Sequence, residues 1–321
     1  MVEGPYELLS QSADLQLEEL ELLYCWTMFT SHGFGDKLID VKAWQLEIPQ
    51  VACNHPFLMH GILAVSALHK SRAEPETSQQ YLVRTVHHQN IALPFYRNII
   101  DDFRKEMTEA NCHAVMAFAS LIIAFAFADL DAVPASACGV ASRSTIPEWI
   151  HLLRGGRKVL QVIKSWIIKG PMAFHLRQAE GDINLSRNPD DARLAALEVL
   201  FEGQDSSHEL PDSEREVYRT TLRLLRQSFA ISLSPDQPLG IKFSMFLWIE
   251  RFPQEYLELL DLRKPEAAIL LPHFCLLLER GAASCWYMVG AAGQLVTALY
   301  NALGDNWRVW MAWPLQQINP G

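Results

Sequence analysis

The sequence has few of the features expected of a protein that binds nucleic acid or metal directly. Lys and Arg number 27 against 37 Asp and Glu, which gives a net charge of −10. Because contact with DNA phosphates needs a concentrated positive surface, we expect no direct nucleic-acid contact by this chain. The six cysteines are scattered without a CxxC pair. Their spacing therefore predicts neither a zinc cluster nor a small disulfide-rich fold.

No apolar run in the sequence is long enough to predict a transmembrane segment. The longest covers residues 114–128 and reads AVMAFASLIIAFAFA, with Ser120 as its one polar member. A membrane-spanning helix needs about 20 apolar residues, and His113 and Asp129 close this run at its two ends. Ala, Leu and Ile are frequent in the run while Gly and Pro are absent, so we expect a buried central helix.

Catalytic and metal-binding signatures are also missing. The sequence contains no GxSxG, Walker or GxGxxG motif. His55, His60 and His69 cannot share one helix face, because successive residues lie about 100° apart. Asp101 and Asp102 lack the second carboxylate cluster that a terpene cyclase needs for Mg²⁺. We expect no catalytic residue, no metal and no cofactor, although an apolar catalytic pocket would leave no spacing signature.

Apolar residues recur three and four positions apart along most of the chain, as in amphipathic helices. Asp14 is suited to cap the first helix, and Asn54 with Pro56 is suited to open the second. We expect one all-α, multi-helix, bundle-like domain over 14–321, after a short tail of residues 1–13. Further helices are expected at about 78–105, 148–168, 213–232, 241–251, 255–262, 265–280, 285–303 and 307–317, with irregular segments at 32–48, 129–147 and 202–212.

Several motifs occur in order along nearly the whole chain. The most specific reads WQLEIPQ at 44–50 and continues as HPFLMHGILAVSALH at 55–69. Others read WIHLLRG at 149–155 and WRVWMAWP at 307–314. These segments resemble the fungal-specific transcription factor domain, the regulatory region that follows a zinc-cluster DNA-binding module in many fungal activators. Within that family they are similar to the sterol uptake control proteins.

The resemblance implies a ligand-sensing domain with an apolar pocket, which binds ergosterol in the sterol regulators. It implies that loss of ligand releases the regulator into the nucleus, where lipid genes are activated. We therefore expect a sterol or similar hydrophobic molecule as partner, and a location in cytoplasm and nucleus. A homodimer or a partner transcription factor is a further expectation, since Trp307 and Trp310 suit either self-association or docking on the core.

Candidate ligand-binding residues come from three segments. Residues 115–125 give one wide apolar face of the central helix. The segment 265–278, which also resembles the family, adds Phe274 and Leu278. Residues 288–293 are small enough for a ligand to approach the backbone, and the resemblance implies that 290–293 lie beside the ligand. Ordinary helix packing is the alternative for each of them. The expected ligand-binding residues are Val115, Phe118, Leu121, Ile122, Phe125, Phe274, Leu278, Met288, Val289, Gly290, Ala291, Ala292 and Gly293.

Three functions remain open from the sequence. The chain is a ligand-sensing regulatory domain, a free-standing enzyme or carrier of the same fold for an apolar substrate in secondary metabolism, or a scaffold that acts only by dimerising. The first sixteen residues contain no Cys, Lys or Arg. We therefore expect either the regulatory part of a longer activator or a free-standing member that does not read DNA itself.

Overall fold

The computed structural model describes residues 17–132, 148–179, 181–202, 210–234 and 239–318. Within these ranges every regular element is helical and no strand occurs, so the all-α prediction is confirmed. The α-helices are α1 (Leu17–Met28), α2 (Leu38–Lys42), α3 (Ile48–Ala52), α4 (Pro56–Ala73), α5 (Ser78–Asp101), α6 (Phe103–Glu106), α7 (Cys112–Ala132), α8 (Glu148–Ile167), α9 (Asp191–Ala195), α10 (Asp212–Ser232), α11 (Ile241–Arg251), α12 (Gln254–Asp261), α13 (Pro265–Ala268), α14 (Leu270–Ala282), α15 (Ala291–Ala302), α16 (Asp305–Arg308) and α17 (Ala312–Ile318).

Short helical turns connect many of these helices. One of them, η2, is a π-helical turn and the others are 3₁₀ turns. They are η1 (Thr30–Phe34), η2 (Ala43–Glu47), η3 (Pro75–Thr77), η4 (Ala173–Leu176), η5 (Leu185–Arg187), η6 (Ala196–Phe201), η7 (Trp286–Met288) and η8 (Val309–Met311).

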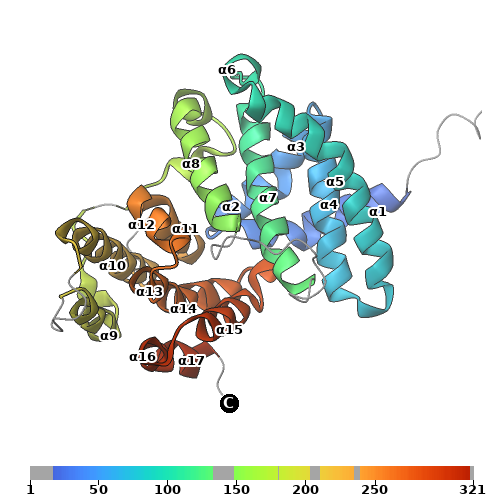
Figure 1. Ribbon diagram of the computed structural model, residues 1–321. Helices are drawn as coiled ribbons and strands as arrows, with labels where there is room; N and C mark the ends of the chain where they lie inside the picture. Colours follow the sequence, from blue (N-terminus) through green and yellow to red (C-terminus); the bar gives the residue numbers. More distant parts are fainter. Residues whose placement is uncertain (1–16, 133–147, 180, 203–209, 235–238, 319–321) are drawn as a thin grey trace, which may run out of the picture.

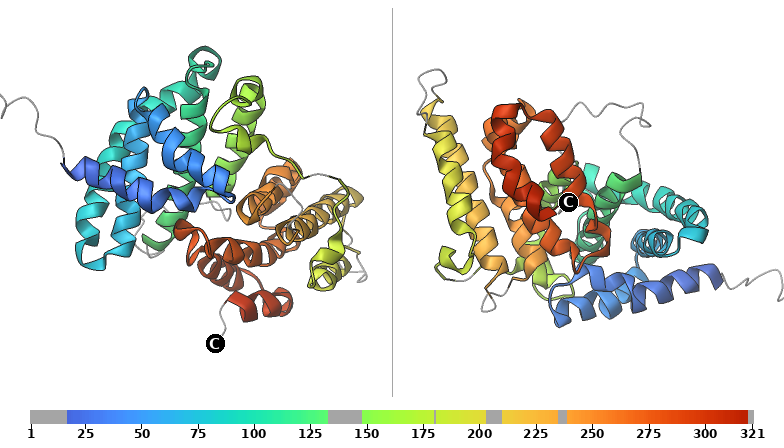
Figure 2. Two further views of the ribbon diagram at one scale, coloured as in Figure 1. Left: turned by 180° about the vertical axis from the view of Figure 1, so that it is seen from behind. Right: turned by 90° about the horizontal axis from the view of Figure 1, so that it is seen from below.

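The helices form two groups that meet at α7 and α8. Figure 1 shows α1, α4 and α5 beside α7, while α9 to α17 gather on the other side of the molecule. The views from behind and from below show the same division (Figure 2). Helix α8 packs against both α7 and α11 and therefore joins the two groups.

Helix α7 is the buried central helix that the sequence predicts. It packs on α4, α8 and η7, so it needs apolar side chains on several faces. Gly61 of α4 allows the closest of these contacts, because a Cβ there would lie 2.7 Å from the Phe118 ring. Phe118 also meets the rings of Phe57 and Tyr96, at centroid distances of 5.5 and 4.9 Å.

The expectation of an irregular segment at 32–48 was wrong. Most of this segment lies in η1, α2 and the π-helical η2, and α3 follows directly. In η2 the N–H of Ile48 bonds the carbonyl of Ala43, five residues back. The cause is Pro49, since its ring would clash with the carbonyl of Gln45 in a regular α-helix. The wider π turn accommodates the proline without ending the helical path.

Other expected boundaries agree with the structure except at segment ends. The helix expected at 78–105 stops at Asp101 and contains Pro94 within it. The segments expected at 265–280 and 285–303 are each divided, into α13 with α14 and into η7 with α15. The predicted cap at Asp14 and most of the predicted loop 129–147 lie outside the described residues.

One hydrophobic cluster extends through both groups of helices, from Trp26 to Met311. Its centre is a stack of aromatic rings in which Trp149 of α8 lies 4.7 Å from Phe127 of α7 and 6.0 Å from Phe274 of α14. Trp248 of α11 stacks on Phe274 at 4.8 Å. The same core therefore fixes α7, α8, α11 and α14 relative to one another.

Candidate functional site

A cavity of about 60 Å³ lies between α7, α8 and α11. A typical ligand pocket holds about 300 Å³ or more, so a sterol-sized molecule fits only when lining side chains move apart. Several of these side chains are half-buried and face this space from different helices. The lining residues are Phe34, Trp44, Met116, Ala119, Ser120, Ile123, Leu153, Gly156, Arg157, Leu160, His175, Lys242, Phe243, Phe246, Glu250 and Tyr287.

The π-helical turn η2 brings Trp44 to the cavity wall. Trp44 is 1 % exposed, and its ring lies 4.9 Å from Phe34 and 6.1 Å from Trp26. Trp26 also donates its indole N–H to the carbonyl of Trp44 at 2.9 Å, and Gln45 donates its amide to the carbonyl of Thr27 at 2.7 Å. These two bonds hold η2 against α1 and fix the position of Trp44. Turns of this π type are rare in proteins, and those that occur are often found at functional sites.

The turn η4 contributes His175, and a partly buried ion pair holds this turn in place. Both terminal nitrogens of the Arg177 guanidinium donate to the Asp40 carboxylate, at 2.8 and 2.6 Å. Asp40 belongs to α2 and is 1 % exposed. Because this bidentate pair links η4 to α2 just before η2, it keeps His175 near the Trp44 side of the cavity. Phe174 contacts both rings, at centroid distances of 4.6 Å to His175 and 6.3 Å to Trp44.

The N-terminus of α11 is tied to the corner between η1 and α2. The Asp36 carboxylate accepts the backbone N–H groups of Lys242 and Phe243, at 3.2 and 3.1 Å. The Lys242 ammonium donates to the carbonyl of Gly35 at 2.7 Å. Burial raises the pKa of Asp36, and these N–H donors counteract that rise. Burial lowers the pKa of Lys242, and neighbouring negative groups oppose that shift.

A charged pair lies further along α11. Arg157 of α8 donates to the Glu250 carboxylate of α11 at 2.9 Å, and both side chains are half-buried. Burial raises the pKa of Glu250, while the Arg157 charge acts in the opposite direction. Phe243 and Glu250 are seven residues apart, or about 10 Å along the helix. The lining therefore has an aromatic end near Phe243 and a charged end near Glu250.

The α7 residues expected to bind ligand do not line this cavity. Val115, Phe118, Leu121 and Phe125 are buried, and Ile122 is half-buried. Phe118 and Leu121 face α4, where Gly61 approaches them. The cavity is lined instead by Met116, Ala119, Ser120 and Ile123, on the roughly opposite side of α7.

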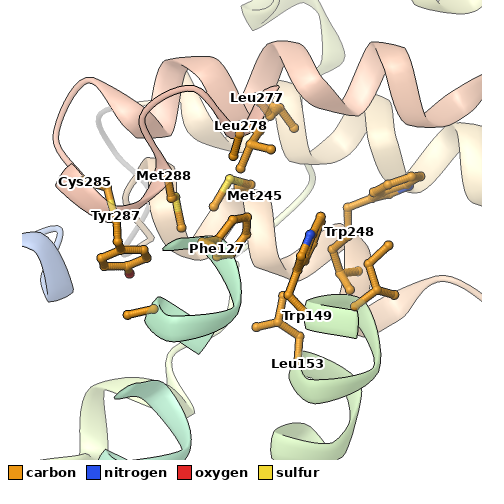
Figure 3. Close-up of a cluster of buried hydrophobic side chains, with 14 of the residues drawn as sticks. Phe127, Trp149, Leu153, Met245, Trp248, Leu277, Leu278, Cys285, Tyr287 and Met288 are labelled. Carbon is orange, nitrogen blue, oxygen red and sulfur yellow. The ribbon is translucent and has the colours of Figure 1, made fainter. Parts of the chain in front are cut away.

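The other expected ligand residues are divided between the core and the surface. Phe274, Leu278 and Met288 are buried, and Figure 3 shows Leu278 and Met288 in one cluster with Phe127 and Met245. Ala291 and Ala292 are also buried in the core, and Gly293 is half-buried. Val289 and Gly290 are exposed, and the positive φ of Gly290 (84°) starts α15. None of these residues lines the described cavity, so their role in ligand binding stays a prediction.

The buried cluster and the cavity are nevertheless neighbours. Leu153 of α8 and Tyr287 of η7 belong to the cavity wall and are also labelled in the cluster of Figure 3. Tyr287 directly precedes Met288, the first residue of the expected 288–293 segment. The expected residues therefore lie next to the cavity, but none of them belongs to its lining.

One signal in the sequence would have identified the cavity face of α7. Ser120 is the only polar residue within the run 114–128. It belongs to the cavity lining, and its hydroxyl donates to the Met116 carbonyl at 3.2 Å. Ser120 is therefore the one residue of this run whose polarity distinguishes one side of α7 from the others. Trp44 and His175 had no such signal, because their positions depend on η2 and on the Asp40–Arg177 pair.

Histidines outside the cavity form one close pair. The Nδ1 atoms of His60 and His88 lie 2.9 Å apart, and burial lowers the pKa of both side chains. Helix geometry alone could not predict this contact, since the two residues belong to α4 and α5. Within the described ranges, no group of three or more His, Cys, Asp or Glu side chains is arranged to hold a metal ion. In the same ranges, no helix is long and apolar enough to cross a membrane.

Two polar side chains of the cavity wall are paired within the protein. Ser120 uses its hydroxyl hydrogen within its own helix, and Glu250 is paired with Arg157. The lining is mostly apolar, with a few polar groups at defined places, which is typical of a site that holds an apolar molecule in one orientation.

Comparison with known proteins places the chain among distant relatives of fungal transcription regulators. No protein-family model matches it. The chain is 29% identical over 154 residues to Sterol uptake control protein 2 of Candida albicans, and 29% identical over 206 residues to the protein of the same name from Saccharomyces cerevisiae. These alignments cover 47% and 60% of this chain but 20% of each relative.

A third relative is aligned over more of its own length. The chain is 23% identical over 275 residues to the Zn(2)-C6 fungal-type transcription factor afumD of Aspergillus fumigatus, which covers 79% of this chain and 66% of that protein. The chain is therefore a distant homologue of sterol uptake control proteins and of Zn(2)-C6 fungal-type transcription factors, and it spans only part of their lengths. The predicted resemblance to the fungal transcription factor domain is confirmed at this level.

Proposed function

We propose that the chain is the ligand-sensing regulatory part of a fungal transcription regulator and that a sterol-like molecule binds in the cavity between α7, α8 and α11. The observation that carries the proposal is this mostly apolar cavity in a chain homologous to proteins named for the control of sterol uptake. Ligand binding controls transcription of lipid or metabolite genes. The domain acts in the nucleus when the cavity is empty and stays in the cytoplasm when it is filled.

The position of the cavity supports a sensing role. Its walls come from η1, η2 and α7 of the N-terminal part and from η4, α11 and η7 of the C-terminal part, with α8 between them. A molecule in this space contacts both groups of helices at once. Filling or emptying it therefore changes the free energy of their relative arrangement, which is the requirement for a ligand-controlled equilibrium.

The α8 wall of the cavity is not closely packed at Gly156. Gly156 lines the cavity, and a Cβ built on it would meet no atom within 4 Å. Its neighbours Arg157 and Leu160 are half-buried and also line the space. The α8 wall therefore has open space at Gly156 that a bulky side chain would fill without disturbing the core.

This open position gives a direct test with a matched control. Gly156→Phe should lower the affinity for a fluorescent 3β-hydroxysterol about tenfold or more, because the ring would occupy the space of the ligand. Gly155→Phe makes the same change to the same helix, at an exposed glycine that does not line the cavity and whose Cβ also meets nothing within 4 Å. It should leave the affinity close to that of the wild type.

Fluorescence titration of the purified variants measures this difference. Circular dichroism and thermal unfolding would establish that both variants are folded. Equal affinities of the Gly156→Phe and Gly155→Phe variants would move the sterol site away from this cavity. A wild-type chain that binds no sterol at all would refute the proposed ligand class.

A further inference from the structure

Two residues that line the cavity each have a buried nitrogen atom with no hydrogen-bond partner among the described residues. These atoms are Nε1 of Trp44 and Nε2 of His175. Trp44 is 1 % exposed, so its indole N–H cannot obtain its missing bond from bulk water. Buried polar atoms of folded proteins are nearly always paired, and an unpaired one needs an explanation. Two of them on residues that line one cavity suggest a partner that the chain itself does not provide.

The two side chains belong to the same part of the cavity. Phe174 contacts both rings, and His175 also lies 5.6 Å from Phe243 at the first turn of α11. The Asp40–Arg177 ion pair ties η4 to the helical segment that precedes Trp44. The charged pair of Arg157 and Glu250 is about two turns further along α11. The aromatic end of the cavity therefore carries the unpaired atoms.

The charge state of this end favours an uncharged partner. Burial lowers the pKa of His175 to about 4, so at pH 7 the ring is neutral and has one donor nitrogen and one acceptor nitrogen. The cation in the same wall, Lys242, already donates to the carbonyls of Gly35 and His32. An anionic head group would find no unpaired cation at this end, whereas a hydroxyl can accept one hydrogen bond and donate another.

We propose that Trp44 and His175 form a polar subsite that binds the hydroxyl group of an otherwise apolar ligand. The indole N–H of Trp44 donates to the hydroxyl oxygen, and the hydroxyl donates to Nε2 of His175. The apolar body of the ligand then extends between α7, α8 and α11 toward Glu250. This subsite rests on the proposed function of the cavity and adds the orientation and the chemical class of the ligand, a neutral alcohol of sterol size.

The test measures the binding of two ligands to the wild type and to a variant of His175. The probes are a 3β-hydroxysterol and its 3-deoxy analogue, and the variant is His175→Phe, which keeps the aromatic contacts with Phe174 and Phe243 but removes both nitrogens. The variant should lower the affinity for the hydroxysterol about tenfold, the effect of one lost buried hydrogen bond. It should leave the affinity for the deoxy analogue unchanged. His175→Gln, which restores a polar atom near the position of Nε2, should recover most of the loss.

Trp44 supplies an independent variant with its own control. Trp44→Phe should weaken hydroxysterol binding selectively in the same way. Trp149→Phe removes another buried indole N–H without a partner, but Trp149 does not line the cavity. The second variant should therefore lack the selective effect, which separates loss of the N–H group at the subsite from a general loss of packing.

The outcomes distinguish failure of the subsite from failure of the proposed ligand class. Equal effects of His175→Phe on both sterols, or no effect on either, would overturn the subsite while leaving the cavity as the binding site. If the wild type binds neither sterol, the ligand class is wrong, and the subsite is then decided with cyclohexanol and chlorocyclohexane by ligand-observed NMR. A preference for cyclohexanol that His175→Phe abolishes would support the subsite, and equal binding of the two probes would refute it.

Discussion

Buried histidines are the residues through which pH acts most directly on this protein. Burial lowers the pKa of His69, His88, His175 and His273 to about 4. In the folded protein these rings stay neutral down to that pH, whereas in the unfolded chain they take up protons near pH 6.5. The unfolded state therefore binds more protons between pH 6.5 and about 4. The stability that these four neutral histidines contribute above pH 6.5 is therefore lost as the pH falls from 6.5 to about 4.

His273 offers the clearest measurement of this effect. It is 2 % exposed, and its Nδ1 lies 2.9 Å from the Ile269 carbonyl, within its own helix. Because the buried ring stays neutral while the unfolded chain takes up a proton, this residue alone should lower the free energy of unfolding by about 2 kcal/mol between pH 7 and pH 5. His273→Asn keeps a donor for Ile269 but does not titrate, so urea unfolding across this range should show a shallower decline. His151→Asn, an exposed control in α8, should keep the wild-type decline, and an unchanged slope for His273→Asn would contradict the prediction.

At the scale of elements, the contact between α4 and α7 depends on the absence of one side chain. A Cβ at Gly61 would lie 2.7 Å from two ring atoms of Phe118 and 3.0 Å from a methyl group of Leu121. Phe118 is held on its other sides by Phe57 and Tyr96, so it has little freedom to move. The glycine is thus required for packing, and this face of α7 does not line the cavity.

Gly61→Ala should therefore lower the free energy of unfolding by about 1–3 kcal/mol through overpacking. Gly155→Ala, in open space on α8, should raise it by about 0.5–1 kcal/mol, since alanine is the better helix former. Chemical denaturation of the two variants beside the wild type would show whether the signs are opposite. An unchanged free energy of unfolding for Gly61→Ala would mean that α4 and α7 can separate slightly without loss of stability.

The sequence predicts the elements better than the faces they present. The spacing of apolar residues is sufficient to predict α7, α8 and α11, because each is long and regular. On α7 only Ser120 distinguishes the cavity side, since the helix is otherwise apolar on nearly every side. The path through 32–48 was missed because Pro49 widens the preceding turn instead of ending it. Trp44 and His175 meet the same cavity through long-range contacts, which no local pattern records.

At the scale of the whole molecule, the cavity lies where the two groups of helices meet. A ligand that binds the folded chain there and not the unfolded chain stabilises it by mass action, by about 2.7 kcal/mol at a hundredfold excess over the Kd. Because its contacts come from α7, α8 and α11 together, the stabilisation should be greatest in these three helices, where the two groups meet. A ligand held at the exposed Val289 and Gly290 would act on α15 and its immediate neighbours instead.

Hydrogen exchange with and without a bound 3β-hydroxysterol separates these two sites directly. We predict slower amide exchange in the segments that line the cavity, 116–123 in α7, 153–160 in α8 and 242–250 in α11, with little change in α5 or α15. Slower exchange confined to residues 288–293 and α15 would place the ligand elsewhere. Sterol binding without slower amide exchange in α8 and α11 would contradict the central claim that the cavity between α7, α8 and α11 is the ligand site.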